Sequence, residues 1–179
     1  GPVTLSLPQD VQAEVFHFPR EFFQEKKHYI HRPSPDRRSL ERAIALLKAA
    51  QRPLVIAGGG VHYSGAEEVL KDFVEKQRIP LVETQAGKAS LPWDHPLNLG
   101  AIGVTGNSAA NRIAEKADLI LCLGTRLADF TTASKSLFHS SEQQLLSINI
   151  SSFDAMKGNA EMLICDLKEG LQSLEDLLE

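Results

Sequence analysis

Long apolar runs, an excess of basic residues and abundant cysteine are all missing from this 179-residue chain. A membrane-spanning helix needs about 20 consecutive apolar residues, and no stretch of the sequence approaches that length or resembles a signal peptide. The formal net charge of −4 at pH 7 offers no basic face to nucleic acid or to an anionic lipid surface. We therefore expect a globular protein whose partners include neither nucleic acid nor membrane.

Cysteine is scarce: the chain has two, Cys122 and Cys165, and both stand inside apolar runs. We expect them to be small core residues in a reducing compartment, and neither a disulfide nor a metal site. Three histidines, His17, His28 and His31, fall in an irregular stretch where no carboxylate or cysteine completes a ligand set at a recognisable spacing. The sequence thus predicts a cytoplasmic protein with no metal site in this chain.

The beginning of the sequence differs from the rest. Residues 1–8 alternate like a strand, no methionine starts the chain, and residues 12–35 show no clean period. We expect residues 1–34 to be the extended tail of a preceding domain followed by an interdomain linker, with the main domain over residues 35–179. An ordinary exposed N-terminal strand, or a cloning remnant in the first two residues, is the alternative.

From residue 35 onward, helical and strand patterns alternate. Apolar residues at 3,4 spacing predict a helix over residues 36–50, and short apolar runs predict buried strands. Such alternation implies right-handed crossovers and a parallel sheet covered by helices on both faces. The fold class is therefore α/β, a doubly wound parallel sheet of the Rossmann-like (DHS-like) NAD/FAD-binding type. The predicted strands cover residues 54–57, 79–83, 118–124, 145–150 and 162–165, and the later helices start near residues 64, 107 and 166.

Polar residues mark the predicted helix starts. Ser64 and Glu67 have the spacing of a capping box, in which each side chain bonds a backbone N–H of the other end. Asp166 and Glu169 form a second box of the same kind. Asn107 is placed to cap the helix between them.

The carboxyl ends of parallel strands form the edge at which ligands of such sheets bind. The first strand enters a glycine triplet at residues 58–60, where the backbone can turn tightly and a ligand can approach closely. A helix start beyond the triplet would offer free N–H groups to an anion. A long loop over residues 84–106 lies at the same edge, and such loops are usually functional or interfacial. The candidate cleft residues are Gly58, Gly59, Gly60, Gly87, Gly103, Gly106, Arg126 and Asp129.

Known catalytic motifs do not complete this cleft. The dinucleotide fingerprint G-x-G-x-x-G fails at its third glycine, although Glu83 stands where a ribose-binding acid is expected. There is no G-x-S-x-G elbow, no P-loop lysine and no H-E-x-x-H. Arg126 could pair with a phosphate or form a loop-shaping salt bridge with Asp129, and Lys88 could be a ligand contact or a structural residue. From its residues alone, the domain has a nucleotide-shaped cleft and no catalytic residue.

Runs such as Pro-Leu-Val-Ile-Ala-Gly-Gly-Gly and Ile-Pro-Leu-Val-Glu-Thr follow one another in a distinctive order. In that order they resemble the central domain of thiamine-diphosphate-dependent enzymes, the acetolactate synthase and pyruvate oxidase group. The start of the chain is similar to the end of the preceding pyrimidine-binding domain, so the resemblance covers essentially the whole sequence. The segments that carry it are residues 1–10, 52–60, 79–84, 96–100, 103–106 and 117–126.

Within that group, residues 83–89, 95–100, 103–107 and 129–136 are similar to the trihydroxycyclohexanedione hydrolases of myo-inositol catabolism. Those enzymes open a cyclic diketone to a deoxyglucuronic acid. Acetolactate synthases usually have Asp-Asp-Arg where this chain has Asp-Phe-Thr from residue 129, and Ile-Asp-Ile-Asp where it has Ile-Asn-Ile-Ser. Because the nucleotide contacts of the family cluster at those strand ends, we expect no FAD in the cleft.

The resemblance implies a three-domain enzyme that uses thiamine diphosphate and Mg²⁺, both bound outside this chain. In the family the activating glutamate belongs to the first domain and a Gly-Asp-Gly motif to the third, and this chain has no such motif. The chain would then be non-catalytic, joining a pyrimidine-binding and a diphosphate-binding domain in a homodimer or homotetramer that acts on a small-molecule substrate. Two alternatives stay open: the central domain of an acetolactate synthase-like carboligase with FAD or ADP in the cleft, and a stand-alone nucleotide-binding module.

Overall fold

The computed structural model describes residues 3–138 and 143–178. It divides the chain into two compact units, Gly1–His31 and Arg32–Glu179. The division falls close to the predicted boundary, while the assignment of the first unit to a preceding domain stays a prediction. The first two residues, where a cloning remnant was the alternative, lie outside the described part of the chain.

The first unit contains little regular structure. Its described residues, 3–31, form one short helix, α1 (Gln9–Ala13), and one turn of 3-10 helix, η1 (Arg20–Phe23). Residues 3–8 belong to no strand, so the alternative of an ordinary exposed N-terminal strand is not seen there, and the tail of a preceding domain stays a prediction. A lone strand leaves its backbone N–H and C=O groups without partners, so alternation by itself does not produce one. The irregular character predicted for the stretch that follows is confirmed apart from these short turns.

Aromatic side chains gather in the middle of this first unit. The rings of Phe16, Phe18, Phe22 and Phe23 pack with centroids 5.0 to 6.0 Å apart. Each of them nevertheless keeps 49% to 72% of its surface exposed. Apolar surface concentrated in this way on a short segment is typical of a region that contacts something else.

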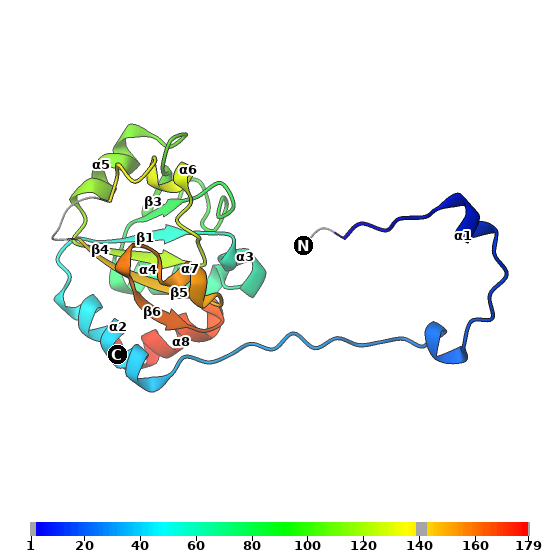
Figure 1. Ribbon diagram of the computed structural model, residues 1–179. Helices are drawn as coiled ribbons and strands as arrows, with labels where there is room; N and C mark the ends of the chain where they lie inside the picture. Colours follow the sequence, from blue (N-terminus) through cyan, green and yellow to red (C-terminus); the bar gives the residue numbers. More distant parts are fainter. Residues whose placement is uncertain (1–2, 139–142, 179) are drawn as a thin grey trace. The chain divides into compact units, whose positions relative to one another are not determined.

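The second unit is built on a six-stranded sheet in the order β3-β2-β1-β4-β5-β6 (Figure 1), and every neighbouring pair is parallel. The predicted doubly wound α/β class is confirmed. Every predicted strand is present within a few residues of its expected place, and β3 is additional. The strands are β1 (Pro53–Ala57), β2 (Leu81–Glu83), β3 (Asn98–Ala101), β4 (Leu119–Leu123), β5 (Gln144–Asn149) and β6 (Glu161–Ile164).

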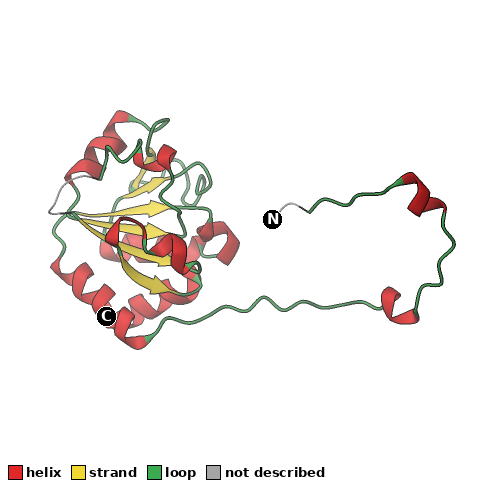
Figure 2. Ribbon diagram, in the orientation of Figure 1, coloured by secondary structure: helices red, strands yellow, loops and turns green. Residues whose placement is uncertain are grey.

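Helices cover both faces of this sheet, as Figure 2 shows by the red ribbons around the yellow strands. On one face, α2 (Arg37–Ala49), α4 (Glu67–Gln77) and α8 (Leu167–Leu178) bury a core with alternate strand residues such as Val55 and Leu121. On the other face, α5 (Ser108–Lys116) packs with residues such as Leu54 and Ile120. The short helices are α3 (Gly60–Ser64), α6 (Asp129–Thr132), α7 (Ser152–Ala155) and the 3-10 turn η2 (Lys157–Asn159). None of the described helices is long and apolar enough to cross a membrane.

Polar caps explain where several helices begin. The Asp36 carboxylate accepts the N–H groups of Arg38 and Ser39, both at 3.1 Å, so helix α2 starts one residue after the expected position. The prediction for Asn107 is confirmed, because its side chain accepts the Ala110 N–H at 2.8 Å. These contacts satisfy N–H groups that the first helical turn cannot pair internally.

The predicted capping box at Ser64 is wrong. The Ser64 hydroxyl donates back to the carbonyl oxygens of Gly60 and Val61 inside α3, and helix α4 has Ala66 at its N-cap without a side-chain bond. The expected partner, Glu67, instead contacts His62. The sequence analysis did not predict the short helix α3 before α4. Ser64 belongs to α3 and bonds within it, so it is not the N-cap of α4.

Of the second predicted capping box, Asp166 and Glu169, only the role of Asp166 as a cap of α8 is confirmed. The Asp166 carboxylate accepts the Lys168 N–H at 3.1 Å. The Asp166 N–H, which Glu169 would satisfy in a capping box, donates to the Pro33 carbonyl oxygen at 2.8 Å. Arg32 also forms an ion pair with Asp166 at 2.6 Å. The start of α8 is therefore tied to the residues that lead into α2.

Candidate functional site

The ligand-binding crevice of a doubly wound sheet is expected where the strand order reverses. In this protein that point lies between β1 and β4, which pair along their whole length from Pro53–Leu119 to Ala57–Leu123. The chain leaves β1 toward β2 on one side and leaves β4 toward β5 on the other. The glycine triplet and Gly124 therefore meet at the predicted site.

The two strand ends are in close backbone contact. The Gly58 N–H donates to the Leu123 carbonyl oxygen at 2.8 Å, and the Gly60 N–H donates to Gly124 at 3.0 Å. A Cβ atom added to Gly60 would lie 2.5 Å from the Gly124 Cα, far inside van der Waals contact. The amides of Gly58 and Gly60 are thus paired within the protein, and α3 is only five residues long. The triplet explains close packing of two loops and gives no support to a phosphate cradle.

The remaining candidate glycines also face backbone. An added Cβ atom would collide with the Ala57 carbonyl oxygen at Gly87 and with the Phe130 carbonyl oxygen at Gly103. Gly103 has φ of +95°, a conformation that L side chains rarely adopt. At Gly106 the added atom would lie 2.6 Å from the Ala101 carbonyl oxygen. These glycines let neighbouring loops approach, and a role in binding a ligand stays a prediction.

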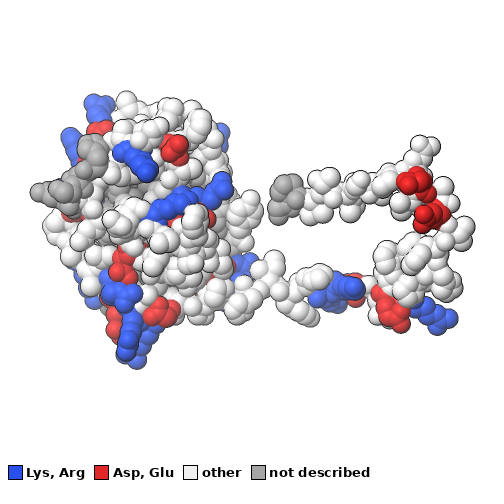
Figure 3. All heavy atoms as spheres, viewed as in Figure 1, with Lys and Arg blue, Asp and Glu red and all other residues white. Residues whose placement is uncertain are grey.

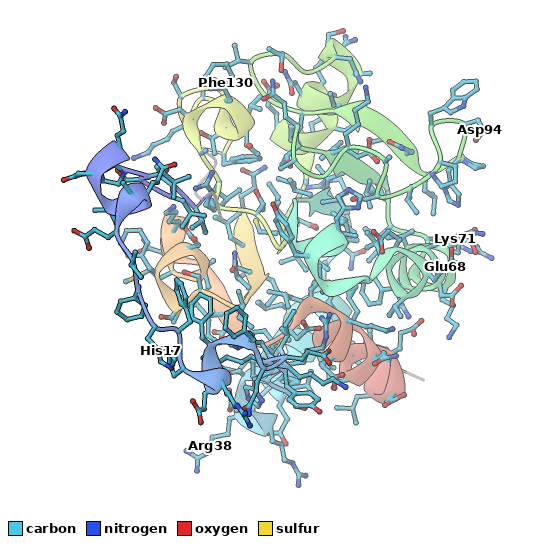
Figure 4. The ribbon with its side chains drawn as sticks, turned by 90° about the vertical axis from the view of Figure 1, so that its right-hand side faces the viewer. His17, Arg38, Glu68, Lys71, Asp94 and Phe130 are labelled. Atoms are coloured by element: carbon cyan, nitrogen blue, oxygen red, sulfur yellow. The ribbon has the colours of Figure 1, made fainter. Side chains whose placement is uncertain are left out.

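Arg126 and Asp129 do not form the salt bridge that the sequence analysis considered as the alternative to a phosphate contact for Arg126. Both side chains are exposed, and no ion pair joins them among the residues that the structure describes. The Arg126 carbonyl oxygen accepts the Lys157 amine at 3.1 Å, which ties this loop to α7 and η2. Asp129 starts α6, and Phe130 beside it is exposed, as Figure 4 shows. A ligand contact for Arg126 stays a prediction.

A hollow of about 550 Å³ lies beside this edge, between the start of α4 and the loop that follows β2. Figure 4 shows Glu68 and Lys71 on α4, below the loop that carries Asp94. Carboxylates of glutamate and amines of lysine line the hollow, together with an almost fully exposed tryptophan. The lining residues are Glu67, Glu68, Lys71, Glu83, Lys88, Ala89, Ser90, Leu91, Pro92 and Trp93.

Glu83 occupies the floor of this hollow and has a structural role. Its side chain is buried, and Oε1 accepts the Leu91 N–H at 3.3 Å and the Asn98 side-chain amide at 3.4 Å. The carboxylate therefore holds the loop over residues 84–97 against β3. The ribose-binding role considered for this position gains no support from a carboxylate that is already bonded to its own loop.

His62 bridges the two sides of the hollow. Its Nδ1 lies 2.8 Å from Glu67 Oε1, and its Nε2 lies 3.0 Å from the Lys88 carbonyl oxygen. The hydrogen bond to Glu67 raises the pKa of the imidazole, and the bond to Lys88 adds to the effect. Sequence reasoning missed this residue, because its second partner lies 26 positions away and no local pattern points to it.

The cysteines confirm their predicted place in the core. Cys122 and Cys165 are both buried and free. Burial raises the pKa of the Cys122 thiol to about 12, and burial with the nearby charges of Asp166 and Glu169 raises the pKa of Cys165 to about 12. Neither thiol is therefore a reactive nucleophile.

Charges of both signs are interspersed over the face of the second unit that Figure 3 shows, without a continuous basic area. Among the described residues, no three His, Cys, Asp or Glu side chains are grouped so that they could hold a metal ion. The exposed apolar side chains near the carboxyl ends of the strands stand out more than the charges do. They include Tyr63, Trp93, Val104, Phe130, Ile150 and Phe153.

The sheet and its helices define a doubly wound parallel α/β domain with the strand order of dinucleotide-binding proteins. At its switch point the ends of β1 and β4 are in close backbone contact. Residues 40–174 match the family model described as thiamine pyrophosphate enzyme, central domain. The chain belongs to this family, as the sequence motifs predicted.

Two curated relatives match the chain over all of its 179 residues. It is 53% identical to a 3D-(3,5/4)-trihydroxycyclohexane-1,2-dione hydrolase of Clostridium tetani (strain Massachusetts / E88) and 52% identical to one of Bacillus cereus (strain AH820). The chain spans 28% of the length of each relative. An X-ray structure from Mycobacterium smegmatis, described as a candidate thiamin diphosphate-dependent enzyme, matches with a TM-score of 0.68 at 21% identity. That match covers 86% of this chain and 30% of the other, and it shows the same fold.

Residues of this chain do not fit the cofactor that the family is named for. A diphosphate group is held in proteins by a metal ion with oxygen ligands or by free backbone N–H groups. The described residues offer no grouped metal ligands, and the amides of Gly58 and Gly60 are already bonded. We therefore assign no chemical step to this chain.

Proposed function

We propose that this chain is the central domain of a thiamine-diphosphate-dependent hydrolase that opens 3D-(3,5/4)-trihydroxycyclohexane-1,2-dione to 5-deoxy-glucuronate in myo-inositol catabolism. The observation that carries the proposal is the identity of 53% over the whole chain to a hydrolase of that name. Membership of the central-domain family supports it independently.

In this proposal the chain contributes structure, while the flanking parts of a longer polypeptide contribute the chemistry. Thiamine diphosphate and Mg²⁺ would be held by a pyrimidine-binding domain before this chain and a diphosphate-binding domain after it. The switch point supports this division, because the amides of Gly58 and Gly60 at the usual ligand edge are bonded to the end of β4. FAD is not expected in the central domain.

Exposed aromatic side chains indicate where this domain would contact the rest of the enzyme. Tyr63, Trp93, Phe130 and Phe153 keep between 62% and 90% of their surface exposed at the carboxyl edge of the sheet. Aromatic side chains of this kind are typical of protein interfaces. We propose that this edge faces the catalytic domains, with the loop over residues 84–106 near the substrate channel, in a cytoplasmic homodimer or homotetramer.

The test is an assay of the full polypeptide encoded by the reading frame that contains this chain. With added thiamine diphosphate and Mg²⁺, the purified protein should open the ring of the cyclic diketone, and omission of either should abolish turnover. The reading frame should also encode a Gly-Asp-Gly motif downstream and a glutamate in an upstream domain. Absence of both motifs would contradict the proposal outright.

The same experiments distinguish the other assignments. Flavin absorbance in the purified protein, with acetolactate formation from pyruvate, would identify a carboligase of the acetolactate synthase kind. Tight NAD binding by this chain, without flanking domains in the reading frame, would identify a stand-alone nucleotide-binding module. Light scattering of the full polypeptide would give the number of subunits.

A further inference from the structure

Both nitrogen atoms of His62 face hydrogen-bond acceptors. Nδ1 lies 2.8 Å from a carboxylate oxygen of Glu67, and Nε2 lies 3.0 Å from the carbonyl oxygen of Lys88. A neutral imidazole has one N–H group and one lone pair, so it can donate to only one of these acceptors. Only the protonated ring can donate to both at once. The geometry of the site therefore requires a cation.

A second histidine in the same unit shows the opposite arrangement. His95 has Nε2 2.9 Å from Glu75 Oε1, which is an acceptor, whereas Nδ1 accepts the Leu97 N–H at 3.2 Å. A neutral ring with its proton on Nε2 makes both contacts of His95. The demand for a charged ring is thus specific to His62 and does not follow merely from having a carboxylate neighbour.

Charged groups surround the His62 ring from the elements packed against it. Glu67 comes from α4 and Glu83 from the end of β2, and the following loop contributes the backbone carbonyl of Lys88. The bond to Glu67 is the largest cause that raises the pKa of His62 above its ordinary value of 6.5, and burial opposes it. The same bond lowers the pKa of the Glu67 carboxyl below 4.5. Ring and carboxylate thus stabilise each other's charged forms.

The loop that His62 holds is under local strain at this point. Ala89, directly after Lys88, has φ of +70°, which is unfavourable for a residue with a Cβ atom. Further along, the Ser90 N–H donates to the Gly87 carbonyl oxygen at 3.1 Å, and the Leu91 N–H is fixed by Glu83. The exposed tip at Lys88 and Ala89 lies between these anchors, and His62 contacts it from α3.

We propose that His62 is a proton-dependent clip that joins α3 and α4 to the loop after β2 as an imidazolium, and that loss of its proton releases Lys88 and opens the tip of this loop. The proton lost is the one on Nε2, because the Glu67 carboxylate holds the proton on Nδ1 more strongly than a neutral carbonyl holds the other. The deprotonated Nε2 then presents a lone pair to the carbonyl oxygen, and the contact breaks. The clip controls access to the hollow beside α4 and does not depend on the proposed activity.

Hydrogen–deuterium exchange of the full polypeptide tests this proposal without any activity readout. Exchange in a peptide covering residues 85–90 is measured between about pH 5 and pH 9 and corrected for the intrinsic rate at each pH. We expect this peptide to exchange about three- to tenfold faster at the upper end, the effect of losing one such hydrogen bond. A corrected rate that does not change with pH in this peptide would overturn the clip.

Two variants locate the proton. His62→Gln should remove the pH-dependent step and leave the peptide exchanging at the faster rate throughout. Glu67→Gln keeps an acceptor oxygen but removes the charge, so the step should move to lower pH; this variant and the wild type decide the matter if His62→Gln does not fold. His95→Gln is the matched control and should leave the step in place. Persistence of the same step in His62→Gln, or its loss in His95→Gln, would contradict the assignment.

Discussion

The junction of β1 with β4 and the hollow beside α4 lie at the same edge of one sheet, and they are built in opposite ways. At the junction, backbone meets backbone: Gly58 and Gly60 donate to Leu123 and Gly124, and no side chain separates them. At the hollow, side chains that can carry a charge tie a loop to its neighbours: Glu83 accepts the Leu91 N–H from beneath, and His62 contacts the Lys88 carbonyl oxygen from beside it.

The two regions differ in how their contacts respond to added side-chain volume and to pH. Backbone contacts between glycines respond to added volume and are indifferent to pH, because no titratable group takes part. The contacts around the hollow depend on the charges of partly exposed groups, such as the His62 side chain with 35% of its surface exposed. We therefore expect the junction to determine stability and the hollow to respond to conditions.

The largest effect is expected from filling the junction. Gly60→Ala places a methyl group 2.5 Å from the Gly124 Cα, and overpacking against backbone should cost about 2–3 kcal/mol of the free energy of unfolding. Urea denaturation of the chain, followed by circular dichroism, measures this loss. Gly59→Ala is the control: its added atom lies 3.2 Å from the Ala86 methyl group, so it should cost under about 1 kcal/mol. Equal losses in the two variants would show that the junction is not tightly closed.

A smaller loss should follow removal of the Glu83 carboxylate. Glu83→Ala leaves the buried Leu91 N–H without its side-chain acceptor and removes one of the three acceptors of the Asn98 amide, which should cost about 1–2 kcal/mol. Glu83→Gln retains an acceptor oxygen and should recover most of the loss. The same denaturation measurement applies, and a harmless Glu83→Ala would mean that the loop is held by other contacts.

Relief of backbone strain at the loop tip should increase the free energy of unfolding, in contrast to the two losses above. Ala89 has φ of +70°, and Ala89→Gly removes the Cβ penalty while making the unfolded chain more flexible. The net gain in the free energy of unfolding should be about 0.5 kcal/mol. A matched variant, Ala86→Gly, lies in the same loop at a residue without positive φ and should destabilise the protein instead.

The smallest effect concerns pH. The raised pKa of His62 stabilises the folded state below 6.5, and this contribution is lost as the pH rises through the folded pKa. The lowered pKa of Glu67 stabilises it above 4.5, and this contribution is lost as the pH falls through the folded pKa. The pair should therefore contribute most between these values, by about 0.2–1 kcal/mol. The stability difference between wild type and Glu67→Gln, measured against pH, should peak in that window, whereas a flat difference would exclude the linkage.

Sequence reasoning found the periodic elements and missed those that lack a period. The strands from Pro53, Leu119 and Gln144 are apolar enough to be recognised as buried. Strand β3 was not predicted, because Asn98–Ala101 has the sequence of a loop. It is half-buried at the sheet edge and includes Gly100 at φ of +85°. Helix α3 escaped because its five residues are too few to show a helical pattern.

The sequence places the candidate cleft residues at one edge of the sheet, and their role in binding a ligand stays a prediction. The glycines do gather at the carboxyl edge, as the parallel sheet requires. The amides of Gly58 and Gly60 bond to Leu123 and Gly124, at a strand end more than 60 residues away in the sequence. No spacing rule connects such distant residues, and the same holds for His62 and Lys88.

The sequence by itself determined the fold class, the buried cysteines and the family, because apolar periodicity and local motifs carry that information along the chain. Only the tertiary structure decided that Gly58 and Gly60 bond to the end of β4, and that His62 lies between two acceptors. Both of these facts depend on which backbone groups of distant segments meet, and a linear pattern does not contain that geometry.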